Sequence, residues 1–253
     1  MTKKVVIFTN YRTGSTAFTL LKSEEYNLPY TAELFCHSRQ NSIGRIPSRH
    51  VLQHGYKIYA YEILDMIQSK ANFIAELNMP ATEACFKVMP LQVDTLQDNI
   101  DIANACDKVY FLYSRDFIRT VKSYIAVRVT GSFGHTGFIT KSNAYTVEHA
   151  REQVLGILGE EKTFREKIDV NDPILTGLIG NVTIPKLRQA IIDNYERMAD
   201  LYHTIGGELI CKEDYFSGDR YRPYNKEVIW SEEVNIEDYD VESLFTIDKR
   251  QKV

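Results

Sequence analysis

Several features that mark large classes of protein are missing from this chain. Its four cysteines lie far apart, and no C-x-x-C pair suggests a zinc site or a disulfide framework. No apolar run approaches the roughly 20 residues that cross a bilayer, and no small-residue cleavage site follows the first lysines. We therefore expect a cytoplasmic protein with free thiols and no membrane span.

An excess of positive charge is also missing. The 34 acidic residues outnumber the 30 lysines and arginines, and the net charge of −4 argues against nucleic acid or an anionic membrane as the main partner. With 253 residues, 44% of them hydrophobic, and no linker-like segment, the chain is expected to form one domain over 1–253. Its acidic end, residues 233–253, fits either an ordered flap or a flexible tail.

Short apolar runs alternate with helical patterns along much of the chain. Strands are expected at 5–9, 56–61, 84–89, 109–113 and 208–211. Helices are expected at 15–23, at 62–75, from 94–95 onward, from 115–116 to about 127, and at 183–205. This alternation predicts a three-layer, P-loop-like α/β fold with a central, mostly parallel sheet flanked by helices. Residues 29–55 are expected to form a loop with short helices that borders the site. The glycine-rich loop at 130–138 fits either a surface connection or a moving loop on the substrate side.

The first strand-to-helix turn, Arg12-Thr13-Gly14-Ser15-Thr16, has the composition of an anion seat. A helix N-terminus presents unpaired N–H groups and the positive end of the helix dipole. Gly14 allows close approach of the backbone, Ser15 and Thr16 add hydroxyl donors, and Arg12 adds a permanent charge. A plain turn is the alternative interpretation.

Two familiar nucleotide loops are absent at this turn. A Walker A loop requires G-x-x-x-x-G-K-[ST], but this turn has one glycine and no lysine after it. A dinucleotide fingerprint requires three glycines as G-x-G-x-x-G, which are missing as well. What remains is a shorter loop whose basic residue precedes the glycine.

A second candidate phosphate site follows the strand at 109–113. Arg115 comes at the end of that strand, and Ser123 lies two turns into the next helix. Ligands of open α/β sheets bind outside the carboxyl ends of the strands, so Arg12 and Arg115 are expected at the same edge. Arginine and serine together can hold a second phosphate. The alternatives are a surface ion pair for Arg115 and a solvent-facing hydroxyl for Ser123.

Together the two motifs resemble the signature of sulfotransferases that use 3′-phosphoadenosine 5′-phosphosulfate (PAPS). In that family R-[ST]-G-[ST]-[ST] binds the 5′-phosphosulfate, and R-[DN] with a serine eight residues after the arginine binds the 3′-phosphate. The resemblance covers residues 4–36 and 84–125, with an arginine-first loop like that of the carbohydrate and bacterial glycolipid branches. Residues 212–215 (K-E-D-Y) are similar to the family's Y-E-D segment. The nucleotide-binding residues that the resemblance implies are Arg12, Thr13, Gly14, Ser15, Thr16, Ala17, Arg115 and Ser123.

The resemblance also implies the catalytic residues. Carbohydrate and bacterial branches use a glutamate in the region of Glu33 as base, and His37 is the alternative base in this chain. Steroid-type members carry a histidine base in a K-T-H segment, where this chain has Met89, which cannot take a proton. Lys87 in the same segment is expected to support charge near the transferred group. Glu33 as a helix-capping or surface carboxylate remains the structural alternative.

The expected activity is therefore transfer of a sulfuryl group from PAPS to a hydroxyl of a small-molecule or carbohydrate acceptor. Such chemistry depends on positioning and charge stabilisation, and it requires no metal. Two alternatives stay open: a nucleotide or small-molecule kinase with a degenerate P-loop, and a nucleotide-binding module without catalysis.

Overall fold

The computed structural model describes residues 2–28, 30–33, 74–75, 77–93, 95–130, 164–168, 184–217, 226–230 and 236–246. The strand expected at 56–61, most of the helix expected at 62–75 and the loop from 131 to 138 lie outside these residues.

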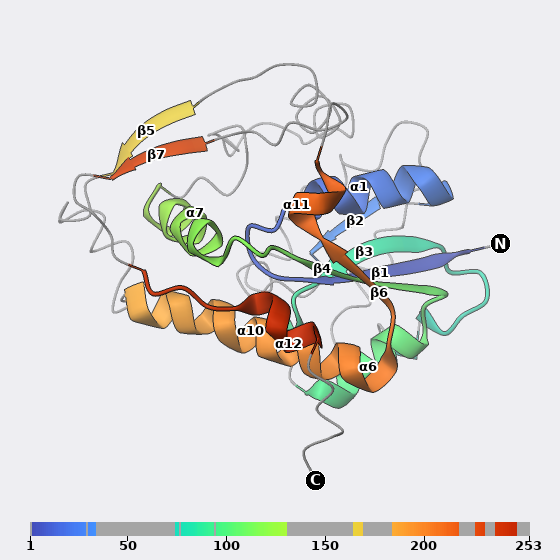
Figure 1. Cartoon of the computed structure of the whole chain (residues 1–253). Coiled ribbons are helices and arrows are strands. Elements are labelled where there is room, and N and C mark those ends of the chain that lie inside the picture. Colours follow the sequence, from blue (N-terminus) through green and yellow to red (C-terminus); the bar gives the residue numbers. More distant parts are fainter. Residues whose placement is uncertain are drawn as a thin grey trace, which may run out of the picture.

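A five-stranded parallel sheet forms the centre of the molecule (Figure 1). Its strand order is β2-β3-β1-β4-β6. The strands are β1 (Lys4–Thr9), β2 (Tyr30–Glu33), β3 (Ala84–Val88), β4 (Lys108–Tyr113) and β6 (Glu208–Cys211). The predicted α/β class is confirmed, and the strands expected at 5–9, 84–89, 109–113 and 208–211 are all present.

Helices cover both faces of this sheet (Figure 1). Helices α1 and α11 lie on one face, and α6, α10 and α12 lie on the other. Helix α7 follows β4 and packs with α10. The helices are α1 (Ser15–Tyr26), the short 3-10 helix η2 (Pro90–Gln92), α6 (Leu96–Asn104), α7 (Phe117–Thr130), α10 (Ile184–Ile205), α11 (Lys212–Tyr215) and α12 (Val241–Thr246). None of these helices is long and apolar enough to cross a membrane.

One expectation about the strands was wrong. The loop predicted at 29–55 begins with β2, which pairs in parallel with β3 at the edge of the sheet. A four-residue edge strand is too short for a periodic pattern, and its place depends on pairing with a strand more than 50 residues later. The structure also contains a separate parallel pair, β5 (Phe164–Ile168) and β7 (Lys226–Trp230), that the sequence did not predict.

Strand β1 is buried on both sides. Val6 and Phe8 face the core under α10, whereas Val5 and Ile7 face the smaller core under α1. This alternation follows from the two-residue repeat of a strand, and it explains why a strand covered on both faces reads as a continuous apolar run. The carboxyl end of β1 is therefore held rigidly between two helical layers.

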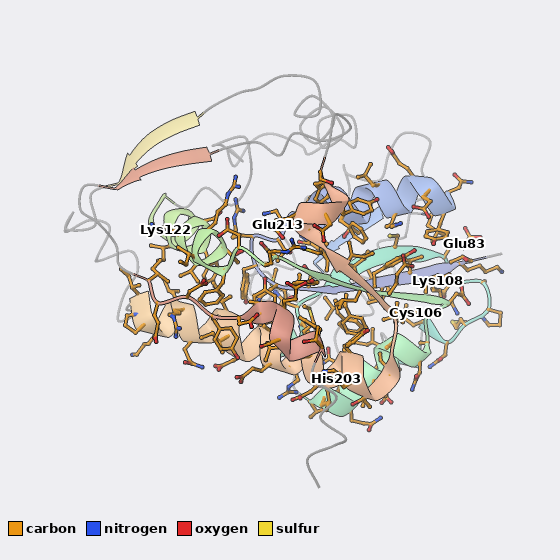
Figure 2. The ribbon with its side chains drawn as sticks, in the orientation of Figure 1. Glu83, Cys106, Lys108, Lys122, His203 and Glu213 are labelled. Carbon is orange, nitrogen blue, oxygen red and sulfur yellow. The ribbon has the colours of Figure 1, made fainter. Side chains whose placement is uncertain are left out.

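Part of the acidic end of the chain is ordered against α10. Ile236, Val241 and Phe245 are buried in the larger core. The Nε2 atom of His203 lies 2.7 Å from the carbonyl oxygen of Leu244. Figure 2 places His203 on this side of the sheet, away from Glu213 of α11. For residues 236–246 the structure thus agrees with the ordered flap, because three apolar side chains are spaced among the acidic ones.

Candidate anion-binding site

The loop from β1 to α1 lies where the connections of the sheet change face. Strand β1 leads to α1 on one face, whereas its two neighbours, β3 and β4, lead to α6 and α7 on the other. Such a switch point leaves an opening outside the carboxyl ends of the strands, which is the usual ligand position in open α/β sheets. Residues 10–14 occupy this position.

The loop turns tightly through two residues with left-handed backbone. Arg12 has φ 60° and Gly14 has φ 75°. Gly14 is the N-cap of α1, and within the described structure no side chain caps this helix. The first helical bond runs from the Phe18 N–H to the Gly14 carbonyl over 3.1 Å. The N–H groups of the first turn thus have no partner inside the helix, which is the arrangement that binds anions.

A buried polar network holds the base of this loop. The hydroxyls of Thr9 and Thr13 lie 2.6 Å apart, and the Thr13 hydroxyl donates to the Asn10 carbonyl over 2.9 Å. The Asn10 amide donates to the Ile191 carbonyl of α10, and the Asn194 amide of α10 donates to the Thr9 carbonyl. The side chain of Thr13 is completely buried in this network, so it is a scaffold and only its backbone can face a ligand.

Lys87 reaches the loop from the neighbouring strand. It is only 3% exposed and lies on the α1 face of β3, in register with Ile7 of β1. Its ammonium group donates to Thr16 Oγ1 over 2.8 Å and to Ser15 Oγ over 3.3 Å. The loop has no lysine in its own sequence, but a lysine on the neighbouring strand contacts it. The predicted site residues Ser15, Thr16 and Lys87 lie together.

Arg12 and Ser123 join the two sequence motifs. The Arg12 Nε donates to Ser123 Oγ over 2.9 Å, although the residues are 111 positions apart. Beside this contact, the rings of Tyr11 and Tyr124 stack with centroids 4.5 Å apart. Two adjacent pairs thus connect the loop to α7, and the hydroxyl of Ser123 contacts the side chain of Arg12.

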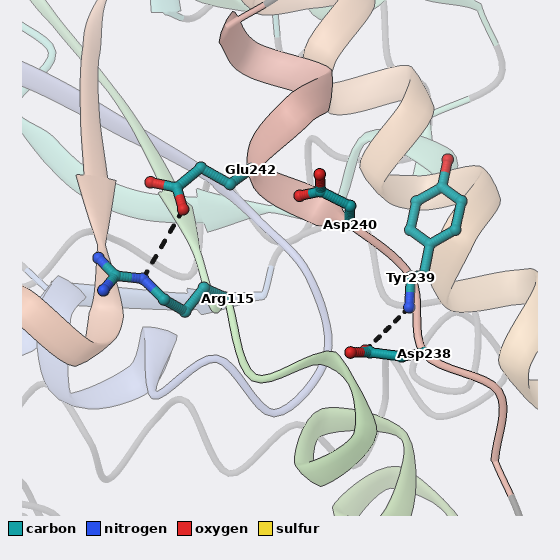
Figure 3. Close-up of a pocket in the computed structure, with 5 residues that line it drawn as sticks. All are labelled: Arg115, Asp238, Tyr239, Asp240 and Glu242. Carbon is teal, nitrogen blue, oxygen red and sulfur yellow. Dashed lines mark hydrogen bonds and ion pairs between the residues drawn. The ribbon is translucent and has the colours of Figure 1, made fainter.

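Arg115 is directed elsewhere. Its Nη2 pairs with Asp214 Oδ2 at 2.5 Å, and its Nε lies 4.0 Å from Glu242 Oε2. The structure therefore does not bring Arg115 and Ser123 to a common partner. Arg115 instead borders a surface hollow of about 430 Å³ (Figure 3). The other residues lining the hollow are Asp238, Tyr239, Asp240 and Glu242.

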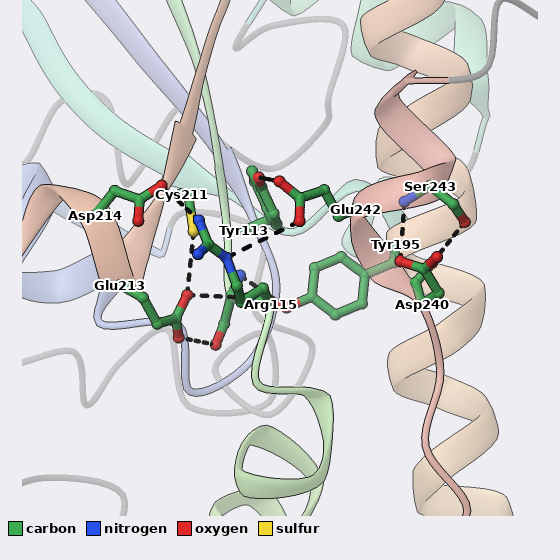
Figure 4. Close-up of polar contacts among 10 residues, drawn as sticks. Tyr113, Arg115, Tyr195, Cys211, Glu213, Asp214, Asp240, Glu242 and Ser243 are labelled. Carbon is green, nitrogen blue, oxygen red and sulfur yellow. Dashed lines mark hydrogen bonds and ion pairs between the residues drawn. The ribbon is translucent and has the colours of Figure 1, made fainter.

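Glu213, in the helix that follows β6, is hydrogen-bonded to the segment that follows β4. It accepts hydrogen bonds from the Ser114 hydroxyl over 2.5 Å and the Arg115 N–H over 3.0 Å, and the Cys211 thiol lies 3.3 Å away (Figure 4). Burial alone would raise the pKa of Glu213, but these hydrogen bonds outweigh it and the pKa is lowered. The carboxylate is thus charged and acts as a structural acceptor beside the candidate site.

We expect Glu213→Gln to lower the free energy of unfolding by about 1–3 kcal/mol at neutral pH, because an amide cannot replace a carboxylate that accepts several hydrogen bonds. The folded-state pKa lies below the ordinary 4.5, so the stabilisation is complete above that value. It is lost as the pH falls through the lower, folded-state pKa. Urea denaturation at neutral and acid pH measures both effects.

The control for this prediction is Glu208→Gln, at the exposed start of β6, the strand that precedes α11. It should leave the free energy of unfolding almost unchanged. A Glu213→Gln variant as stable as the wild type, or one whose deficit grows below pH 4.5, would contradict the role of this carboxylate.

Lys212 is a site residue that sequence reasoning did not identify. It begins α11, is partly buried, and its Cε lies 3.8 Å from where a Cβ on Gly14 would be. Burial lowers the pKa of Lys212, and Arg119 and Arg12 act in the same direction against the opposite effect of Glu213. The only sequence signal was its position in the segment similar to Y-E-D.

Glu33 ends β2 at the same edge of the sheet as the loop. Its backbone is in register with Lys87, which contacts the loop directly. Its side chain and all of His37 lie outside the described part of the structure. The choice of base between the two remains a prediction.

No family model matches the chain, and no curated protein matches it. Across the residues that the structure describes, no group of three His, Cys, Asp or Glu side chains is arranged to hold a metal ion. What the loop binds must be inferred from its own residues.

Proposed function

We propose that the chain is a sulfotransferase that moves the sulfuryl group of PAPS to a hydroxyl of a small-molecule or carbohydrate acceptor. The observation that carries this proposal is the Arg12–Ser123 hydrogen bond, since it joins both halves of the signature at the topological switch point. Neither motif alone distinguishes a nucleotide site from an ordinary turn. Their meeting across 111 positions supports a single nucleotide site.

The residues around the loop suit a phosphosulfate. The uncapped first turn of α1 offers N–H donors, and Lys87 adds a positive charge at Ser15 and Thr16. When bound, PAPS supplies an activated sulfuryl group and a phosphate that leaves with additional negative charge. Donors already in place around that charge contribute most of the rate enhancement in such transfers.

We assign the proton transfer to Glu33. Its place at the end of β2, in register with Lys87, puts its backbone at the edge of the sheet where the loop lies. A carboxylate there would take the proton of the acceptor hydroxyl. The acceptor needs only a hydroxyl that can reach this edge, so sugars, phenols and other hydroxylated compounds all qualify.

A thermal-shift titration with adenosine 3′,5′-bisphosphate (PAP), the nucleotide product, tests the proposal. At about 100 times its Kd, the bisphosphate should stabilise the protein by roughly 2.7 kcal/mol, which raises Tm by roughly 5–10 °C for a domain of this size. Adenosine 5′-monophosphate is the matched control without the 3′-phosphate and should shift Tm less. No shift with the bisphosphate, together with a clear shift with ATP and magnesium, would overturn the sulfotransferase proposal.

A nucleotide or small-molecule kinase is the second candidate. The observation that favours it is Lys87, because this lysine brings to the loop the charge that a Walker A lysine would supply. The ATP arm of the titration decides between the two. A protein that binds the bisphosphate but transfers no sulfuryl group to any hydroxylated compound would be the third alternative, a binding module without catalysis.

Arg115 gives a separate prediction about the 3′-phosphate. If Arg115 holds that group, the phosphate must replace Asp214 as its partner, so Asp214→Asn should tighten bisphosphate binding roughly two- to fivefold. Isothermal titration calorimetry measures the change. Asp238→Asn is the control, because it removes the same charge from the rim of the hollow. If Asp214→Asn and Asp238→Asn bind the bisphosphate with the same affinity, Arg115 does not hold the 3′-phosphate. Arg12 and Ser123 are then the residues that bind it.

We also propose a cytoplasmic location. Cys85, Cys106 and Cys211 are free thiols, which is the expected state in a reducing compartment.

A further inference from the structure

Positive side chains reach the β1–α1 loop from three different strands. Arg12 belongs to the loop after β1, Lys87 is carried by β3, and Lys212 follows β6. In the sheet order, β3 lies on one side of β1, and β4 and β6 lie on the other. Lys87 and Lys212 therefore approach the loop from opposite sides.

Aromatic contacts hold Lys212 over the loop. The rings of Tyr215 in α11 and Phe18 in α1 meet edge-on with centroids 4.8 Å apart. Phe216 lies 3.4 Å from where a Cβ on Gly14 would be, and its side chain is buried in the smaller core. Helix α11 is thus fastened to the first turn of α1, which keeps the backbone of Lys212 beside the loop.

Lys212 lies among charges of both signs, and burial is the main cause that lowers its pKa. Arg12 and Arg119 repel its ammonium group, whereas Glu213 and Asp116 attract it. No hydrogen bond or ion pair from this ammonium group to a described residue is present. A partly buried cation held near two guanidinium groups is unfavourable until an anion arrives.

We propose that Lys212 is a third cationic ligand of the anion bound at the β1–α1 loop, and that the site holds a group with at least two negative charges, such as a phosphosulfate or a diphosphate. The proposal rests on the proposed function in one respect, namely that this loop is the nucleotide site. It adds a ligand and a charge requirement that the two phosphate-binding motifs did not contain. A monoanion would leave part of the positive charge at the loop uncompensated.

Calorimetric titration of Lys212→Met with the bisphosphate and with pyrophosphate tests this inference. We expect both ligands to bind about 10- to 100-fold more weakly than to the wild type, because a charge-assisted contact is lost. Lys212→Arg should recover most of the affinity, and Lys108→Met, at the exposed amino end of β4, should change nothing. The ligand-free Lys212→Met protein should melt at the same temperature as the wild type or higher, because the variant removes the cost of burying the ammonium group.

The pH dependence provides a second readout. Affinity of the wild type for the bisphosphate should fall as the pH rises toward the lowered pKa of Lys212, below the ordinary 10.5. Arginine side chains keep their charge over this range. The affinity of Lys212→Arg should therefore change less with pH than that of the wild type, and the difference between the two reports on Lys212.

The outcomes separate this inference from the proposed function. Equal bisphosphate affinity in wild type and Lys212→Met would overturn the role of Lys212 and leave the sulfotransferase proposal standing. Binding of pyrophosphate but not bisphosphate, with the same loss in Lys212→Met, would support the role of Lys212 and contradict the sulfotransferase. A Lys212→Met protein that binds weakly and also melts lower would assign Lys212 a structural role. Absence of binding of either ligand to the wild type would overturn the inference.

Discussion

Glu33→Gln should slow sulfuryl transfer by about 10²–10⁴-fold, the contribution of a well-positioned general base. Glutamine keeps the size and hydrogen-bonding ability of glutamate but cannot accept a proton from the acceptor hydroxyl. Because Glu33 lies on β2 rather than in the loop, affinity for the bisphosphate should change by less than about twofold. Steady-state rates measured by mass spectrometry of the sulfonated product, with calorimetry for binding, separate the two quantities.

Two further variants complete this test. Glu208→Gln removes a carboxylate at the opposite, amino end of a strand and should keep the wild-type rate. His37→Gln tests the alternative base. Full activity of Glu33→Gln together with a large loss in His37→Gln would move the assignment to His37. Full activity of both variants would contradict general-base catalysis by this segment.

Lys87→Met should lower kcat by about 10²–10³-fold, the usual loss when one donor to a developing negative charge is removed. Methionine has a similar length and fills the same buried space, so the sheet should keep its packing. The bisphosphate should also bind about 10- to 100-fold more weakly, since the charge at Ser15 and Thr16 is gone. Single-turnover kinetics and calorimetry measure these effects.

The control for Lys87 is Lys108→Met, on the exposed amino end of β4. It removes the same charge from the protein, so a general electrostatic effect would appear in both variants. If Lys87→Met retains the wild-type kcat while losing affinity alone, Lys87 binds the ground state and does not stabilise the transition state. Unchanged kcat and affinity would exclude Lys87 from the site.

Most strands and helices were predictable because their signals are local. Strand β1 reads as an apolar run since both faces are covered, and α6 begins with a capping box in which Thr95 accepts from the Asp98 N–H. Helix α10 ends at Ile205, and Gly206 directly after it adopts a left-handed φ of 71°. Strand β2 was missed because only its pairing with β3 defines it.

The local features of the candidate site were predictable and its long-range contacts were not. The anion seat at residues 12–16 was predictable, since a strand, a glycine turn and a helix start follow one another in the chain. Which residue each side chain contacts could not be predicted. Ser123 was paired with Arg115 in the sequence, yet its hydroxyl meets Arg12, and Arg115 turns to Asp214.

The alternation of strands and helices, the position of the glycine turn and the absence of a lysine from it could all be read from the order of residues along the chain. Which cations reach that turn depends on the packing of distant segments. Lys87 reaches it because β3 pairs with β1, and Lys212 reaches it because α11 folds back onto α1. Both contacts join residues more than 70 positions apart. Local propensity does not predict contacts between residues so far apart in the sequence. Strand order and core packing determine these contacts when the whole chain folds.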